Sequence, residues 1–130
     1  MRSSVPTANP WSDIVGYSRA VRTGNLVVVS GTTASGPEGQ ALCPGDPGGQ
    51  TRLILERIGA ALNTLGASLE DVVETRIYVC DIGQWEAVGR VHGEVFAVVR
   101  PATTMVEVSR LIGPDLLVEI SALAVCAGQG

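Results

Sequence analysis

The chain of 130 residues is long enough for one domain with a substantial apolar core and too short for two. Apolar residues make up 45 per cent of it and charged residues 17 per cent, which excludes a disordered chain. The net charge of −4 disfavours a nucleic-acid partner, because phosphates attract basic patches. No apolar run approaches the length of a membrane span, and the first residues lack the apolar block of a signal peptide. We therefore expect residues 1–130 to form a single cytoplasmic domain without a membrane partner.

The basic residues, the histidine and the cysteines limit the available chemistry. All nine basic residues are arginine, so mechanisms that need a lysine, such as a Schiff base, an anchored pyridoxal phosphate or a phosphate-binding loop, are excluded. The single histidine, His92, cannot build a multi-histidine metal site, and the three cysteines are too widely spaced for a zinc site or a disulfide framework. We expect no metal and no cofactor, which leaves carboxylates, hydroxyls, arginines, backbone groups and His92 for catalysis.

The first predicted elements are a hairpin and a long loop. Residues Tyr17–Arg22 and Leu26–Ser30 are rich in β-forming residues and flank a Thr-Gly-Asn turn, which predicts two antiparallel strands. The segment Gly31–Gly49 is rich in glycine and proline. We expect it to form a loop, and it is longer than a simple connection requires.

Two helices on either side of a strand are predicted next. Apolar residues recur at helical spacing in Gln50–Leu65. Residues Val72–Cys80 alternate between the two faces of a strand. Asp81 and Gln84 have the spacing of an N-terminal capping box, and the helix that would follow ends before Pro101.

The last quarter of the chain, Arg100–Val125, is predicted to form an antiparallel strand pair. Its two β-rich runs are joined by a turn that contains Gly113 and Pro114. Each run carries one carboxylate among apolar neighbours, Glu107 in the first and Glu119 in the second. A lone acid in a strand is costly to bury unless it is paired or functional, so these glutamates indicate a site.

The predicted order is β-β-α-β-α-β-β, an α+β fold in which two helices cover one face of a sheet. By strand alternation the opposite face mixes charged and apolar side chains, which is typical of a surface where subunits meet. On that face we expect Glu74, Arg76, Tyr78, Met105, Glu107, Leu117, Glu119, Ser121 and Leu123.

Three separated blocks of the sequence match a known pattern in the same order. They are GYSRAVRTGNLVVVSG at 16–31, QTRLILERIGAALNTLGASLEDVVETRIYVCDI at 50–82, and RPATTMVEVSRL followed by LVEISALAV in the last quarter. Together these blocks resemble the reactive intermediate deaminase family, also called Rid or YjgF, over nearly the whole chain. The resemblance implies a chorismate-mutase-like fold and a homotrimer with a small-molecule pocket at each subunit interface. It also implies hydrolysis of enamines and imines, such as 2-aminoacrylate, to keto acids and ammonia.

The resemblance assigns candidate site residues one by one. The family's glutamate in the last strand, which handles the attacking water, falls on Glu119, and its tyrosine in the first strand falls on Tyr17. The Ser-Gly pair that closes the second strand falls on Ser30 and Gly31. An aromatic residue on the second helix is replaced by His92.

One hallmark of the family's best-known branch is absent. An arginine that binds the substrate carboxylate follows Pro-Ala in that branch, whereas this sequence has Thr103 there, followed by Thr104. A hydroxyl cannot replace a bidentate guanidinium. We therefore expect little hydrolysis of general 2-imino acids unless another arginine takes over the role, with Arg19, Arg52 and Arg100 as the first candidates.

Each candidate residue also has a structural interpretation. Glu119 is either a general acid/base or the partner of an arginine such as Arg76, whereas Glu107 fits a structural role better. His92 lies on the apolar stripe of its helix, which is typical of a core histidine. Because it takes the place of an aromatic residue that faces the pocket in the family, a role in proton transfer is the alternative interpretation. Thr103 and Thr104 are placed to line a pocket.

Two functions of different class remain open at this stage. In the first, the protein hydrolyses, deaminates or moves a proton on a small enamine, imine or related metabolite, with Glu119 as acid/base. In the second, it is a regulatory protein that binds a small molecule without turnover. Ribonuclease activity, reported for some relatives, fits poorly with the acidic net charge.

Overall fold

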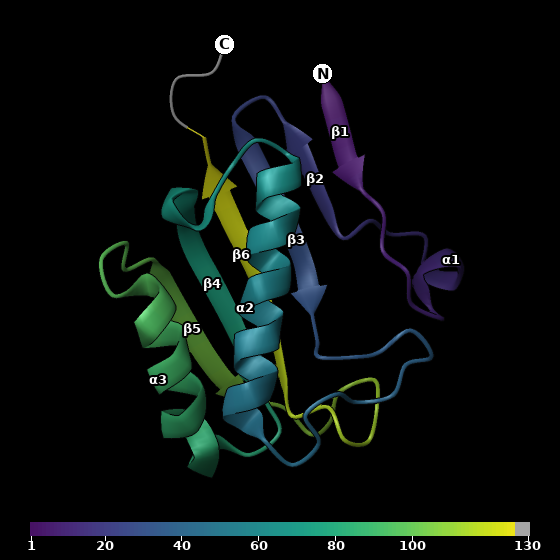
Figure 1. Ribbon diagram of the computed structural model, residues 1–130, viewed down its shortest axis with the longest axis vertical. Coiled ribbons are helices and arrows are strands. Elements are labelled where there is room, and N and C mark those ends of the chain that lie inside the picture. The colour runs from purple at the N-terminus through teal and green to yellow at the C-terminus, as the bar shows by residue number, and fades with distance from the viewer. Residues whose placement is uncertain (127–130) are drawn as a thin grey trace.

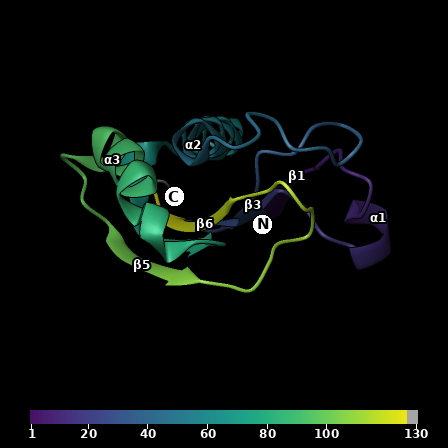
Figure 2. The ribbon, with the colours of Figure 1, turned by 90° about the horizontal axis from the view of Figure 1, so that it is seen from below.

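The computed structural model describes residues 1–126 and shows one six-stranded sheet with both long helices on the same side (Figures 1 and 2). The strand order is β1-β2-β3-β6-β4-β5. Along the chain the elements are β1 (Arg2–Val5), α1 (Ser12–Val15), β2 (Ala20–Thr23), β3 (Leu26–Thr32), α2 (Pro47–Thr64), η1 (Leu69–Asp71), β4 (Val72–Val79), η2 (Ile82–Gln84), α3 (Trp85–Phe96), β5 (Ala102–Glu107) and β6 (Val118–Val125).

The α+β architecture with two helices on one face is confirmed, and the predicted order holds from β2 onward. The prediction lacks β1 and α1, because a four-residue element is too short to show a periodic pattern. Within residues 1–126, no helix combines the length and the apolar character needed to cross a membrane.

The last two strands do not pair with each other, so the predicted antiparallel pair is wrong. β6 lies between β3 and β4 and runs antiparallel to both, while β5 pairs with β4 in parallel at the edge of the sheet. β4, α3 and β5 therefore form a strand–helix–strand unit, the connection that parallel neighbours require. Alternation along a strand shows which residues share a face, but it does not show which strand lies alongside.

The helix starts also differ from the prediction. α2 begins at Pro47 with Asp46 as its N-cap, and the Asp46 carboxylate accepts a hydrogen bond from the Gly49 amide at 2.9 Å. The predicted capping box at the second helix does not form. Asp81 instead caps the short η2 turn, and Gln84 makes no side-chain cap bond at the start of α3.

The core fills the layer between the helices and the sheet. Alternate residues of β6 face the helices and are buried there, and the inward face of α2 packs onto them. The opposite face is open in the single chain, where Val28, Val73 and Val106 are 41, 49 and 41 per cent exposed. The buried residues of β6 and α2 include Val118, Ile120, Ala122, Ala124, Ile54, Ile58 and Leu62.

Two residues expected on the open face, Met105 and Glu107, lie on the helix side instead. The parallel register places Met105 opposite Ile77 and Glu107 opposite Val79, and both of these β4 residues are buried. Met105 packs against the core, and the Glu107 carboxylate accepts a hydrogen bond from the Ile82 amide at 2.9 Å. Glu107 therefore caps the η2 turn, which is a structural role.

Gln50 joins the start of α2 to the segment that leads into β6. Its side chain is fully buried: Nε2 donates to the Asp115 carbonyl at 3.0 Å and to the Cys43 carbonyl at 3.3 Å, and Oε1 accepts from the Leu117 amide at 2.8 Å. These bonds satisfy backbone groups that the fold removes from water. They also anchor the chain immediately before β6 enters the sheet.

We expect Gln50→Leu to lower the free energy of unfolding by about 2–4 kcal/mol, because buried amide and carbonyl groups lose their partners. Urea unfolding followed by circular dichroism measures the change. Gln84→Leu is the matched control, since the Gln84 side chain is exposed and makes no cap bond, and it should change stability by less than about 0.5 kcal/mol. Equal stability of the two variants would contradict the anchoring role.

Candidate active site

A pocket of about 270 Å³ beside the end of β3 brings together four of the predicted site residues. Glu119 comes from β6, Tyr17 from the connection between α1 and β2, and Ser30 and Gly31 from β3. The N-terminal segment and the loop after β3 also line the pocket, which the sequence does not predict because neither segment carries a periodic pattern. Their lining residues include Thr7, Asn9, Trp11, Thr33 and Ser35.

An irregularity in β3 aims Gly31 at Glu119. The register between β3 and β6 shifts between Val29 and Thr32, so β3 has one extra residue there, as in a β-bulge. The shift brings the Gly31 backbone so close to the Glu119 carboxylate that a Cβ atom at position 31 would overlap it. A side chain at position 31 would therefore displace the Glu119 carboxylate, whereas glycine permits the close approach.

The Glu119 carboxylate is half-buried and has no ion-pair partner among residues 1–126. Desolvation raises its pKa, because burial penalises the charged form. The ion pair with Arg76 considered above does not form within the chain. Arg76 instead lies 3.5 Å from Glu74 on its own strand.

The Tyr17 hydroxyl is held by two donors from the N-terminal segment. Asn9 Nδ2 donates to its oxygen at 2.6 Å and Trp11 Nε1 donates at 3.1 Å. Because these bonds use the acceptor capacity of the oxygen, its own proton is left to donate elsewhere. The pocket thus combines an oriented hydroxyl donor with a carboxyl group whose pKa is raised.

His92, Thr103 and Thr104 lie outside this pocket. The Thr75 hydroxyl on β4 is fully buried and lies 2.9 Å from His92 Nε2 and 2.8 Å from the Thr103 hydroxyl. His92 and Thr103 therefore meet on the helix side of the sheet, where both line a separate cavity. Burial lowers the pKa of His92, which favours the neutral imidazole.

Thr104 takes the opposite direction from Thr103. It pairs with Arg76 across β4 and β5, so it lies on the same open face as Glu119 with β4 between them. The single chain therefore divides the predicted site residues into separate groups rather than one pocket. Within the described residues, no group of three or more histidine, cysteine, aspartate or glutamate side chains is placed to hold a metal ion.

The chain matches known proteins along most of its length. The family model described as Endoribonuclease L-PSP matches residues 7–126. A RutC family protein from Pyrococcus horikoshii is 36% identical over 124 residues, which cover 95% of this chain and 98% of that protein. The chain belongs to this family, which is also known as the YjgF or Rid family.

Solved structures confirm the YjgF fold. The crystal structure of a YjgF family member from Mycobacterium tuberculosis has a TM-score of 0.86 and 51% identity, covering 96% of this chain and 99% of that one. Escherichia coli TdcF with bound serine has a TM-score of 0.78 and 26% identity, covering 95% of this chain and 94% of that one. The resemblance seen in the three sequence blocks is thereby confirmed.

In this YjgF family protein we expect Gly31→Ala to lower the free energy of unfolding by about 1–3 kcal/mol, because the added methyl group displaces the Glu119 side chain. The cost should shrink when Glu119→Ala is also present, since the shortened side chain vacates that space. Urea unfolding of the two single variants, the double variant and the parent protein measures this coupling.

Gly93→Ala in α3 is the control, because a Cβ atom there meets nothing within 4 Å. It should be neutral or slightly stabilising, since alanine is the better helix former. An equal cost of Gly31→Ala in both backgrounds would show that the carboxylate is not what excludes the methyl group.

Proposed function

We propose that this YjgF family protein is a cofactor-independent enzyme that acts on a small enamine, imine or related metabolite, with Glu119 as general acid/base. The supporting observation is a half-buried carboxyl group with a raised pKa and no ion-pair partner in the described chain, facing a pocket. Proton transfer is most effective when the pKa lies near the working pH. A carboxylate kept only for stability would normally be paired or hydrogen-bonded at such a site.

The proposed hydrolysis of an imine needs only Glu119 and water. Glu119 takes a proton from the water as its oxygen adds to the C=N carbon, and passes that proton to the nitrogen. The proton of the new hydroxyl group follows the same route as the C–N bond breaks, which yields a carbonyl compound and ammonia. Moving a proton between the carbon and the nitrogen of an enamine would use the same group. Tyr17 would donate a hydrogen bond to the developing negative charge.

The size of the ligand is supported by a relative. Escherichia coli TdcF has been solved with bound serine, a molecule that fits a pocket of about 270 Å³. Endoribonuclease activity, named in the family description, receives less support, because a net charge of −4 opposes binding to a phosphate backbone.

The proposal includes a homotrimer with its pockets at subunit interfaces. The open sheet face leaves Val28, Val73 and Val106 in contact with water in a single chain, and such a patch favours an interface. Assembly would also let Thr103 and Thr104 of one subunit approach the Glu119 pocket of another. A single chain does not bring these residues together.

We expect Glu119→Gln to lower the rate of imine hydrolysis at least about a hundredfold without unfolding the protein. Because the native pKa is raised, the native state binds more protons than the unfolded state between the two pKa values, and stability falls as the pH rises through that interval. The variant loses this dependence. Near pH 8 it should melt at or above the wild-type temperature, and the difference should shrink toward pH 4. Ammonia release from small imines with and without a carboxylate measures the rate, and calorimetric melting measures the stability.

Glu107→Gln is the matched control, because Glu107 caps η2 through the Ile82 amide. It should lower stability by about 1 kcal/mol and leave the rate unchanged. Melting of Glu119→Gln far below wild type near neutral pH, or turnover at the full rate, would overturn the acid/base role. A protein that binds imine analogues but turns over none of them would be the regulatory binder instead.

For the assembly, we expect light scattering of the wild-type protein to give three times the mass of one chain. Val28→Asp should lower that mass, since a charge is costly to bury at an interface. Val98→Asp is the control, because Val98 follows α3, outside the sheet, and is 94 per cent exposed. A stable, well-folded wild-type monomer would exclude both the trimer and the interface pocket.

A further inference from the structure

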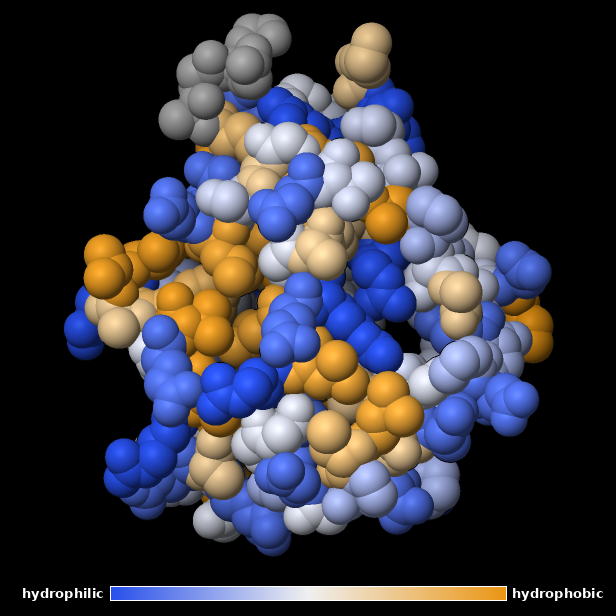
Figure 3. All heavy atoms as spheres, in the orientation of Figure 1, coloured by the Kyte–Doolittle hydropathy of each residue, from blue (hydrophilic) through white to orange (hydrophobic). Residues whose placement is uncertain are grey.

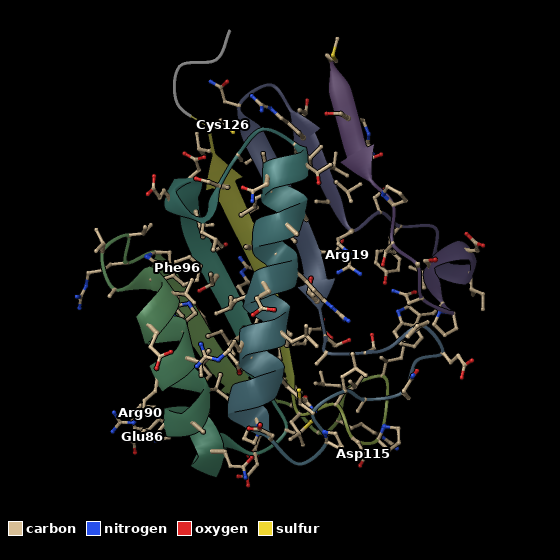
Figure 4. All side chains as sticks on the ribbon, viewed as in Figure 1. Arg19, Glu86, Arg90, Phe96, Asp115 and Cys126 are labelled. Carbon is tan, nitrogen blue, oxygen red and sulfur yellow. The ribbon has the colours of Figure 1, made fainter. Side chains whose placement is uncertain are left out.

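Within residues 1–126, two arginines beside the Glu119 pocket have no acidic partner. Arg19, next to β2, lines both the Glu119 pocket and a second cavity of about 390 Å³, and Arg57 of α2 lines the second cavity. Asn9 and Ser35 line both cavities as well, so the two spaces adjoin. Figure 4 shows Arg19 in the space between α2 and the N-terminal segment, and Figure 3 shows the surface hollowed there, with hydrophilic residues at its border.

We propose that Arg19 and Arg57 bind a carboxylate of the ligand whose reactive end lies at Glu119. This inference rests on the proposed function and narrows its substrate class to imines or enamines that carry a carboxylate. The pair would take the role of the arginine that Thr103 replaces, from a different part of the fold.

The contacts of the two side chains orient them for this role. Arg57 Nη1 donates to the Thr33 carbonyl at 3.0 Å and to the Ser35 carbonyl at 2.8 Å, and Arg19 Nη2 donates to the Thr7 hydroxyl at 2.9 Å. These bonds use one nitrogen of each guanidinium. Within residues 1–126 the remaining N–H groups have no protein acceptor, and no carboxylate lies within 4.0 Å of either side chain. A planar, pre-oriented guanidinium with free N–H groups suits a carboxylate.

The local charge at the two arginines favours an anion, although the protein as a whole has a net charge of −4. Both side chains are half-buried. Burial and then the nearby Arg19 charge lower the pKa of Arg57, which means that the two cations disfavour each other. Guanidinium groups stay protonated despite such a shift. A bound carboxylate would offset the repulsion between them.

The other arginines considered from the sequence have different surroundings. Arg52, also on α2, forms an exposed ion pair with Glu94 at 3.0 Å. Arg100 lines the separate cavity that contains His92 and Thr103. Of the three arginines named from the sequence, Arg19 is the one that lines the Glu119 pocket.

Isothermal titration calorimetry with pyruvate, succinate, 2-oxoglutarate, inorganic phosphate and the neutral amide of pyruvate tests the proposal. We expect at least one carboxylate to bind the wild-type protein, more weakly as salt rises, and the amide not to bind. Arg19→Gln and Arg57→Gln should each weaken binding by about tenfold or more, because each removes a charge-assisted hydrogen bond. Arg52→Gln, on the same helix as Arg57, should leave it unchanged.

Several results would overturn the proposal. They are no binding of any carboxylate, binding of phosphate alone, affinities unchanged in Arg19→Gln and Arg57→Gln, and an equal loss in Arg52→Gln. Arg57→Gln also removes the hydrogen bonds to the loop after β3. Arg57→Lys, which keeps the positive charge, is therefore measured as well, and the melting temperature of each variant is compared with that of the wild type. A loss in the Arg57 variants supports the site only if Arg19→Gln, whose melting temperature should match wild type, shows the same loss.

The failure of this inference can be told from the failure of the proposed function. Carboxylate binding that depends on both arginines, together with full turnover in Glu119→Gln, would support the anion site and contradict the acid/base role. Loss of turnover in Glu119→Gln, together with wild-type rates of Arg19→Gln on both neutral and carboxylate-bearing imines, would support the enzyme and contradict the anion site.

Discussion

The insertion of β6 between β3 and β4 is the constraint on which both the core and the candidate site depend. One face of β6 supplies buried apolar residues beneath α2, and the other carries Glu119. The bulge where β3 meets β6 then places Gly31 against the Glu119 carboxylate. The residue proposed for catalysis therefore lies in a strand that is hydrogen-bonded to a neighbour on each side, and these neighbours fix its position.

The chain tolerates two electrostatic costs near one another. Glu119 is removed from water without an ion-pair partner in the described chain, and Arg19 and Arg57 bring like charges together. Each lowers stability, because desolvation and repulsion both oppose charge. The apolar core between α2 and the sheet contributes the free energy that offsets these losses. A ligand with complementary groups would pair the unpaired charges at the pocket.

The sheet divides the predicted site residues between its two sides. His92 and Thr103 are joined through Thr75 on the helix side, whereas Glu119 and Tyr17 line the pocket beside β3. The parallel register pairs Thr103 with Thr75 and Thr104 with Arg76. Neighbouring residues of one strand point to opposite faces, so the two threonines lie on different sides of the sheet. Thr103 and Thr104 are therefore separated by the backbone itself.

The sequence by itself determined the family, the α+β class, the two helices and the strands from β2 onward, because helical periodicity, strand alternation and the matching blocks are all local patterns. It also named Glu119, Gly31, Ser30 and Tyr17, which the fold brings to one pocket. Only the tertiary structure decided the neighbours of β5 and β6, the face of Met105 and Glu107, the buried bonds of Gln50, and the approach of Arg19 to Arg57. Each of these joins segments far apart in the chain, and the free energy that selects such a contact arises only when the whole core excludes water around it.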